Sequence, residues 1–465
     1  MSSISAPVLG ELPADLVRTA ADDLAPLLTD WRGLKTGTAD AVLLPRTTAE
    51  VQQIVRWAGH HGVGVVPQGG NTGLVGGGVP EAVHEGPVAL LSLRRMNAIE
   101  SIDPAGLSMV VGAGAILEHV HAAAEAAGCR FPLSLAAKGS ATIGGLVSTN
   151  AGGVQVLRHG TMRALVLGVE AVLADGSVLD QLSALRKDNS GYDLKQLLIG
   201  AEGTLGVVTR VALRLAPALK ARSTAWIGLA SAEAALAVLR RLRAEAGETV
   251  ESFELIAADA LDLTLQHMPG LRAPLEGAHR FHVLIELAGP AEQLEQVLAD
   301  AIEAGEIEDA AIAASEAQGQ AMWAIRETIP EAEKRDGPSV KNDISVAVAD
   351  VPAFHEAAVA MLAARHPGTR PFVFGHLGDG NLHWNIRAPV DATPAWLKGE
   401  GEEARHGLHD LIASFQGSIS AEHGIGTLKA AELARLGNPG KLAAMRAVKA
   451  ALDPQGLMNP GKLFA

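Results

Sequence analysis

The stretch Pro67-Gln68-Gly69-Gly70-Asn71-Thr72-Gly73-Leu74-Val75-Gly76-Gly77-Gly78 decides the fold of this chain. It directly follows the apolar run 63–66, which is predicted to form a buried strand. Glycine tolerates positive φ and a close approach of the backbone, so successive N–H groups of such a loop can converge on one anion. We therefore expect this loop to hold a diphosphate, with a mobile surface loop as the alternative.

Two further glycine-rich segments lie in the same half of the chain. One spans residues 132–153 and contains Lys138-Gly139-Ser140-Ala141-Thr142-Ile143-Gly144-Gly145; the other is Gly200-Ala201-Glu202-Gly203-Thr204-Leu205-Gly206. Three such segments are hard to explain as three mobile loops. The sequence has neither a G-x-G-x-x-G motif that opens a helix nor a G-x-x-x-x-G-K-[ST] motif, which argues against a Rossmann or P-loop enzyme. We expect a dinucleotide that is bound in another way.

Helix and strand signals alternate along the chain, as in an α/β or α+β fold. Before residue 218 the spacing predicts helices at about 48–62 and 116–127, and strands at 88–93, 166–173 and 205–215. After Pro217 the glycine clusters disappear, and the pattern predicts a half-buried strand over 281–287 and helices over 294–302 and 442–452. We expect one domain over residues 1–217, a second over 218–419, and a C-terminal segment, 420–465, that returns to the first.

Composition excludes several classes of protein. Lys and Arg number 38 against 52 Asp and Glu, a net charge of −14, and no basic stretch of the kind found in nucleic-acid binders occurs. One cysteine, Cys129, excludes a disulfide framework and a cysteine-rich metal cluster, and we expect it to be buried as a small apolar residue. We find no secretory signal and no uncharged apolar run of about 18 residues. These features predict a cytoplasmic enzyme.

The stretch Gly375-His376-Leu377-Gly378-Asp379-Gly380-Asn381-Leu382-His383-Trp384-Asn385 predicts a metal site. Its turn lets the imidazoles of His376 and His383 converge, and imidazole suits zinc, manganese or iron. The second turn, Ala421-Glu422-His423-Gly424-Ile425-Gly426, offers Glu422 as a third ligand. Three protein ligands leave a position open for substrate, as in catalytic rather than structural sites. The alternative is that the histidines only bridge buried polar groups.

Segments 67–78, 135–153 and 202–206 resemble the vanillyl-alcohol-oxidase-type FAD-binding fold, and the histidine motifs resemble those of its D-2-hydroxyacid dehydrogenase branch. The resemblance spans nearly the whole chain. It implies an α+β fold, an FAD-binding domain with an α+β cap domain that carries the metal motif, and FAD held non-covalently, because loop 68–78 lacks a histidine. The cofactor contacts that it implies are Gln68, Gly69, Gly70, Asn71, Thr72, Gly73, Leu74, Pro132, Gly139, Ser140, Gly144, Gly145, Thr149, Asn150, Gly152, Gly153, Glu202, Gly203, Gly206 and Asn459.

The same resemblance implies roles for residues of the second half. His376, His383 and Glu422 match ligands of a divalent metal, for which we expect zinc, with manganese or iron as the alternatives. His423 matches the catalytic base, and Asn385 matches a substrate contact. Arg326 and Lys341 match a pair that binds the distal carboxylate of dicarboxylic substrates. Surface ion pairs with Glu327, Glu331 or Asp343 are the alternative for that pair. Pro330 stands where some 2-hydroxyglutarate enzymes have a threonine, which weakens the assignment of that substrate.

These expectations define a reaction. A D-2-hydroxy acid, D-2-hydroxyglutarate first and D-lactate or a longer acid second, loses its hydroxyl proton to His423 and a hydride to the flavin, giving a 2-oxo acid. The acceptor of the second half-reaction stays open between an electron-transfer flavoprotein, a quinone and a cytochrome, and a homodimer is one open oligomeric state. The rival functions are a zinc hydrolase, which leaves the glycine segments unused, and a flavoprotein subunit of a glycolate-oxidase-like assembly.

Overall fold

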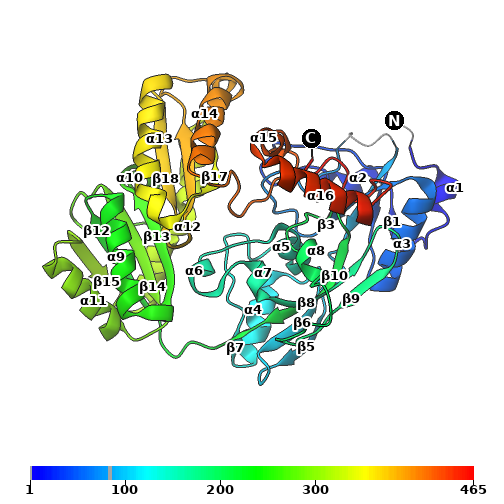
Figure 1. Ribbon diagram of the computed structural model, residues 1–465, viewed down its shortest axis with the longest axis horizontal. Helices are drawn as coiled ribbons and strands as arrows, with labels where there is room; N and C mark the ends of the chain where they lie inside the picture. The colour runs from blue at the N-terminus through cyan, green and yellow to red at the C-terminus, as the bar shows by residue number, and fades with distance from the viewer. Residues whose placement is uncertain (1–2, 82–85, 465) are drawn as a thin grey trace. The chain divides into compact units, whose positions relative to one another are not determined.

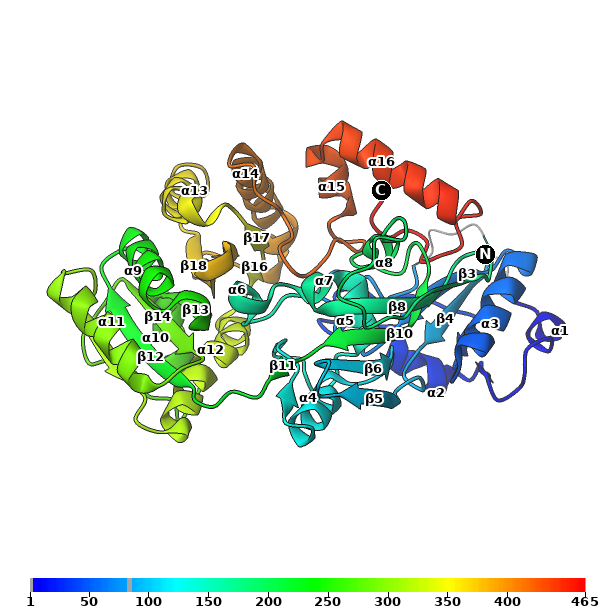
Figure 2. The same cartoon turned by 60° about the horizontal axis from the view of Figure 1, so that its bottom comes forward.

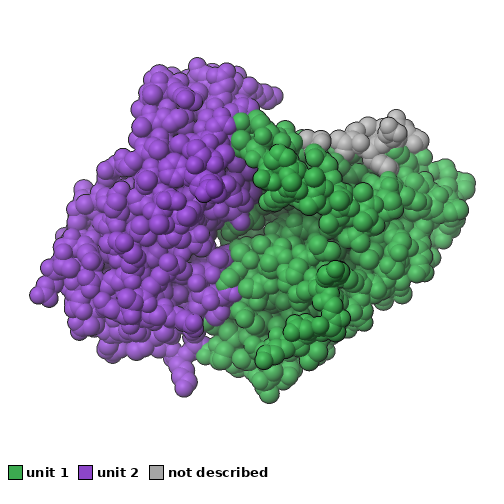
Figure 3. All heavy atoms as spheres, in the orientation of Figure 1, with its two compact units in different colours: residues 1–152, 160–218, 422–465 green, residues 153–159, 219–421 purple. Residues whose placement is uncertain are grey.

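The computed structural model describes residues 3–81 and 86–464, and these fall into two compact units. Unit 1, green in Figure 3, comprises residues 1–152, 160–218 and 422–465, and unit 2, purple, comprises residues 153–159 and 219–421. The divisions lie within two residues of the bounds expected after 217 and 419. Residues 153–159 pack with unit 2, which the sequence did not predict. None of the described helices is both long and apolar enough to cross a membrane.

Unit 1 contains two main sheets in its described residues (Figure 1). The first has the order β1-β2-β4-β3, in which β2, β4 and β3 run parallel. The second is antiparallel, with the order β5-β6-β10-β8-β9; Figure 2 shows β8 and β10 side by side. The strands are β1 (Val17–Arg18), β2 (Ala41–Leu43), β3 (Gly64–Gln68), β4 (Val88–Ser92), β5 (Ile99–Asp103), β6 (Ser108–Gly112), β7 (Cys129–Arg130), β8 (Val166–Val172), β9 (Val178–Gln181), β10 (Val207–Arg214) and β11 (Ala216–Pro217).

Helices cover these sheets and bury one apolar face each. In α3 the side chain of Thr47 accepts the N–H of Glu50 and closes a capping box, and Gly62 ends the helix with φ 64°. The helix thus begins at Thr48, in agreement with the predicted helix over about 48–62. Cys129 is buried, as predicted. The main helices of unit 1 are α2 (Ala21–Leu24), α3 (Thr48–His61), α4 (Leu117–Ala126), α5 (Ile143–Thr149), α7 (Met162–Leu165), α8 (Lys195–Leu198), α15 (Ala430–Leu436) and α16 (Pro439–Leu452).

The C-terminal tail runs along β3, the strand that leads into the first glycine loop. The N–H of Val65 donates to the carbonyl of Leu457 over 2.8 Å, and the N–H of Asn459 donates back to the carbonyl of Val65 over 2.8 Å. This short parallel bridge places the end of the chain beside residues 67–78.

Unit 2 is built on an antiparallel sheet with the order β15-β12-β14-β13-β18-β19-β16, and β17 pairs with β19. The strand over 281–287 is buried on both faces, because helices cover both, so the prediction of a half-buried strand was wrong for His282 and Glu286. The strands are β12 (Ser223–Leu229), β13 (Val250–Ala257), β14 (Phe281–Leu287), β15 (Asp309–Ile312), β16 (Ser339–Val340), β17 (Asp343–Ser345), β18 (Arg370–His376) and β19 (Asn381–Arg387).

Helix α12 matters most for the site because it packs on the face of the β18–β19 hairpin. Its residues Met322, Ile325 and Ile329 share one apolar cluster with Phe372 and Phe374 of β18. The main helices of unit 2 are α6 (Val156–His159), α9 (Ala232–Glu245), α10 (Ala258–His267), α11 (Ala291–Glu303), α12 (Glu316–Asp336), α13 (Val351–Arg365) and α14 (Glu400–Ser414). Mixed sheets and helices in both units agree with the predicted α+β class.

Candidate active site

The first two glycine-rich segments lie against each other in unit 1. A Cβ on Gly69 would lie 2.0 Å from Oγ1 of Thr142, and a Cβ on Gly70 would lie 2.0 Å from the carbonyl oxygen of Ser140. No side chain fits at either position, so glycine is required for this close approach. The loop that the sequence assigned to a diphosphate is therefore part of a packed wall, not a mobile loop.

The third segment joins the same wall through Asn459 of the C-terminal tail. Its side-chain Nδ2 donates to the carbonyls of Gly77 over 3.0 Å and of Glu202 over 2.6 Å. The N–H of Glu202 in turn donates to the carbonyl of Ser148 over 2.7 Å. The structure thus brings together all three glycine segments and Asn459, which the sequence had linked to one cofactor.

Three buried polar atoms in this wall have no hydrogen-bond partner among the described residues: Gln68 Oε1, Thr142 Oγ1 and Asn459 Oδ1. Buried polar atoms are rarely left unpaired, so unpaired ones beside a glycine cradle indicate a missing polar ligand. Asn71 and Asn150 also hold the left-handed conformation, with φ of 57° and 50°, which turns the backbone sharply at both segments. These features fit a dinucleotide cofactor.

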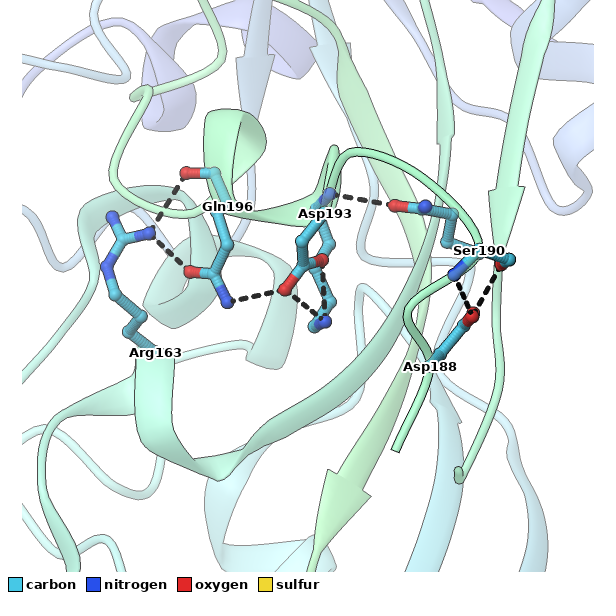
Figure 4. A network of polar contacts seen from close by, with 7 residues as sticks. Arg163, Asp188, Ser190, Asp193 and Gln196 are labelled. Carbon is cyan, nitrogen blue, oxygen red and sulfur yellow. Dashed lines mark hydrogen bonds and ion pairs between the residues drawn. The ribbon is translucent and has the colours of Figure 1, made fainter. Parts of the chain in front are cut away.

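A polar network fixes the loop that enters the third segment (Figure 4). The guanidinium of Arg163 donates to the side-chain oxygen of Gln196 over 2.6 Å and to its carbonyl over 2.9 Å. Gln196 Nε2 donates to Asp193, and the hydroxyl and N–H of Ser190 both contact Asp188. The loop is therefore held by its own side chains immediately before Gly200.

The turn that carries Glu422 and His423 is attached to the third segment by Glu202. Oε1 of Glu202 accepts the N–H of Ile425 over 2.8 Å, and Oε2 accepts the N–H of Gly426 over 2.7 Å. Burial raises the pKa of Glu202 although both N–H groups oppose that change. His423 Nε2 lies 3.7 Å from Oε1 of Glu422. Unit 1 thus carries His423, the predicted base, on a turn that Glu202 of the third glycine segment holds in place.

In unit 2 the β18–β19 hairpin brings the two metal-motif histidines together. His383 lies opposite Phe374, and His376 is two residues further along the same face of the hairpin. Their ring centroids are 5.8 Å apart. Asp343 of β17 faces His383 from the other side, with their ligand atoms within 4.8 Å, and accepts from Asn381 Nδ2 over 2.9 Å. Asp343, which the sequence analysis considered only as an ion-pair partner, places a further carboxylate oxygen beside His383.

Arg326 forms a buried ion pair rather than the surface pair considered from the sequence. Its Nε donates to Oε2 of Glu254 over 2.8 Å, and its guanidinium carbon lies 4.9 Å from the ring centre of Phe374. Oε1 of Glu254 lies 2.6 Å from Nδ1 of His376. Burial alone raises the pKa of Glu254, but the charges of His376 and Arg326 outweigh it and lower the pKa to about 2.

Lys341 and Asn385 share a second buried carboxylate, Glu333 of α12. Nδ2 of Asn385 donates to Oε2 of Glu333 over 2.8 Å, and the ammonium of Lys341 forms an ion pair with the same oxygen. Oδ1 of Asn385 accepts the N–H of Asn342 over 2.8 Å, which fixes the amide orientation. All five residues that the sequence assigned to this half before position 420 therefore lie on one hairpin, the adjoining turn and the helix that covers them.

Sequence analysis missed Glu254 and Glu333. One signal was available for Glu254, because a glutamate within the apolar strand sequence Val250-Glu251-Ser252-Phe253-Glu254-Leu255 must be paired when buried. Glu333 carries no such signal, since it lies in a charged stretch of α12. Neither Glu327 nor Glu331 pairs with Arg326 or Lys341; Glu331 contacts Arg335 instead.

Known proteins match the chain along nearly its whole length. Residues 218–463 match the family of FAD linked oxidases, C-terminal domain, and residues 39–181 match the FAD binding domain. The mitochondrial D-2-hydroxyglutarate dehydrogenase of Bos taurus is 40% identical over 454 residues, which cover 96% of this chain and 81% of the bovine protein. The D-2-hydroxyglutarate dehydrogenase of Xanthomonas citri pv. viticola is 38% identical over 457 residues, 97% of this chain and 95% of that protein.

Solved structures show the same fold at low sequence identity. p-Cresol methylhydroxylase with substrate bound is 17% identical and has a TM-score of 0.76, covering 98% of this chain and 95% of that one. This likeness confirms the predicted vanillyl-alcohol-oxidase-type fold, and the match of residues 39–181 to the FAD binding domain confirms the predicted FAD cofactor. A zinc hydrolase, the rival reading of the histidines, is excluded. The chain belongs to the FAD-linked oxidases, and within them to the FAD-dependent D-2-hydroxyacid dehydrogenases.

Proposed function

We propose that the chain oxidises D-2-hydroxyglutarate to 2-oxoglutarate. The observation that carries this proposal is the state of Arg326. Its Nε donates to Glu254, and its guanidinium carbon lies near the ring of Phe374. Nη1 and Nη2 have no hydrogen-bond partner among the described residues. Two parallel N–H groups are the fork that binds a carboxylate in two-point fashion. Lys341, in the same unit, supplies a second positive charge for a distal carboxylate.

The glycine segments of unit 1 would hold FAD through backbone N–H groups and through Gln68, Thr142 and Asn459, whose buried oxygens lack partners there. Bound FAD supplies the acceptor for the hydride that leaves C2 of the substrate. Loop 68–78 contains no histidine, which supports non-covalent attachment. An external acceptor, whether an electron-transfer flavoprotein, a quinone or a cytochrome, would then reoxidise the enzyme.

His376, His383 and Glu422 would supply the ligands of a divalent metal. Two imidazoles and carboxylate oxygens form a donor set that suits zinc, manganese or iron, and Asp343 adds a further oxygen beside His383. Such an ion supplies charge that favours the deprotonated form of a hydroxyl group. Nδ1 of His376 contacts Oε1 of Glu254, and a carboxylate on one ring nitrogen is the usual support for a histidine that binds a metal through the other.

His423 would take the proton of the substrate's 2-hydroxyl. A neutral imidazole suits this task because its pKa lies near the working pH. Its turn is fixed by the two hydrogen bonds that Glu202 accepts, so the imidazole is held on the unit that carries the FAD segments. Asn385, whose amide is oriented by Asn342 and Glu333, would contact the substrate.

D-lactate is the second candidate substrate, and Pro330 favours it. Pro330 lies inside α12, one turn after Arg326, and offers no hydroxyl to a distal carboxylate. The two candidate substrates are distinguished by comparing kcat/KM for D-2-hydroxyglutarate with kcat/KM for D-lactate, both measured with an artificial electron acceptor. A ratio well above one, lost in Arg326→Met, supports the dicarboxylate. A ratio below one that Arg326→Met leaves unchanged would overturn it.

A further inference from the structure

Two buried glutamates of unit 2 each contact two residues of the proposed site, one of which is cationic. Glu254 and Glu333 are both 1% exposed. Glu254 connects His376, a proposed metal ligand, with Arg326, and Glu333 connects Asn385, a proposed substrate contact, with Lys341. Burying a carboxylate is unfavourable, and apolar residues of similar volume usually stabilise such positions as well or better. Two buried carboxylates with the same arrangement therefore indicate a role beyond stability.

We propose that Glu254 and Glu333 are positioning residues that hold the proposed metal-binding and substrate-binding side chains of unit 2 in fixed orientations. The inference rests on the proposed function, because it concerns the residues that would bind the metal-side carboxylate and the distal carboxylate. Neither glutamate needs to touch the substrate. Each acts by holding its two partner side chains in a single orientation.

The two glutamates differ in how they hold their partners, and this difference makes the proposal testable. Glu254 uses both oxygens, Oε1 for His376 and Oε2 for Arg326, and both partners are donors. A glutamine has one acceptor oxygen, so Glu254→Gln either loses one of the two contacts or donates its amide to Nδ1 of His376, which puts the ring proton on Nε2 and prevents that nitrogen from binding a metal. Glu333 accepts both Asn385 and Lys341 on Oε2, while its Oε1 is buried without a partner among the described residues. Glu333→Gln therefore keeps an acceptor for both.

The orientation of Arg326 also depends on Glu254. Its Nε donates a hydrogen bond to Glu254, and its guanidinium carbon lies 4.9 Å from the ring centre of Phe374. Losing the Nε contact leaves only the contact with Phe374, which is not directional enough to fix the guanidinium in one orientation. The fork would then meet a carboxylate in several orientations, which weakens two-point binding.

The experiment compares Glu254→Gln, Glu254→Asp, Glu333→Gln and Glu333→Ala in the FAD-loaded full-length protein. Readouts are bound metal by elemental analysis, and KM and kcat for whichever D-2-hydroxy acid the wild type oxidises. Glu254→Gln should lose bound metal and raise the KM for the dicarboxylate at least about tenfold, the loss expected for one charge-assisted hydrogen bond. Glu333→Gln should keep both properties near wild type, and Glu333→Ala should raise KM while the metal stays bound.

Controls separate positioning from folding. Glu286→Gln removes another buried carboxylate of the same sheet, one that contacts Trp323 and Arg222, and should leave metal content and KM unchanged. Glu254→Asp keeps the charge but shortens the reach, so it should fold even if Glu254→Gln does not, and should lose one of the two properties. Equal behaviour of Glu254→Gln and Glu333→Gln, or of Glu254→Asp and wild type, would overturn the proposal. A wild type that prefers D-lactate would contradict the proposed substrate, yet the metal readout would still test Glu254.

Discussion

Glu202 accepts the backbone N–H of Gly426 over 2.7 Å, and this contact ties the third glycine segment to the turn that carries His423. The two residues are 224 positions apart in the chain. Its other oxygen holds the N–H of Ile425, so one carboxylate fixes two successive backbone groups. The residue that the sequence linked only to FAD therefore also determines where the proposed base stands.

Replacing Glu202 should slow flavin reduction. Glu202→Gln has a single acceptor for two N–H donors, so one contact is lost, and Glu202→Ala loses both. We expect about a tenfold slower flavin reduction for Glu202→Gln and a larger loss for Glu202→Ala, measured by anaerobic stopped-flow absorbance. Glu118→Gln, an exposed change on α4 of the same unit, is the control. Wild-type rates in Glu202→Ala would show that this turn has no part in the reaction.

His423→Asn should reduce the rate of flavin reduction by about two to four orders of magnitude, the usual contribution of a general base. The FAD content should stay at the wild-type level because the glycine segments do not include His423. The rate and the ratio of flavin to protein absorbance are measured on the same sample. A variant that keeps its FAD and reduces it as fast as wild type would remove His423 from the mechanism.

Much of unit 1 follows from local sequence signals, whereas the charge pairs of unit 2 do not. The first glycine loop was predictable because Gly69 and Gly70 have to meet Thr142 and Ser140 without a side chain, and clustered glycines record that need. The pairing of Arg326 with Glu254 joins residues 72 positions apart, and no spacing rule connects a helix residue to a strand residue at that separation.

Metal ligation should be separable from FAD binding. Dialysis against a chelator should remove the metal and abolish flavin reduction by substrate, while the visible flavin spectrum persists, because the two sets of residues do not overlap. Readdition of zinc or manganese should restore the reduction. His383→Ala should resist this restoration and bind less metal by elemental analysis. A chelated protein that reduces flavin at the wild-type rate, with its metal shown to be absent, would contradict a role for the metal.

Because His282 is buried in its neutral form, we expect the protein to lose stability at mildly acidic pH. It is buried in unit 2, and Nε1–H of Trp226 donates to its Nδ1 over 3.1 Å, so it is neutral in the fold. Burial, with a smaller effect of His279, lowers its pKa from 6.5 to about 4. Between these two pH values the unfolded chain binds a proton on His282 that the folded chain does not bind. The stability associated with neutral His282 is therefore fully present above pH 6.5 and is lost as the pH falls towards 4, by up to about 3 kcal/mol.

Urea unfolding at pH 7.5 and pH 5 tests this behaviour. His282→Gln keeps an acceptor for Trp226 and cannot titrate, so its unfolding free energy should change less between the two pH values than that of the wild type. His60→Gln, at an exposed position of α3, is the control and should retain the full pH dependence. An identical pH dependence in His282→Gln and the wild type would assign the acid sensitivity to other groups.

The most direct test of the proposed function is the anaerobic visible spectrum of the FAD- and metal-loaded protein before and after D-2-hydroxyglutarate is added. The proposed function, in which Arg326 and Lys341 would bind the distal carboxylate, predicts rapid bleaching of the flavin absorbance by the D enantiomer. It also predicts slower bleaching by D-lactate and none by L-2-hydroxyglutarate. A flavin spectrum that D-2-hydroxyglutarate leaves unchanged while D-lactate bleaches it would contradict the dicarboxylate assignment.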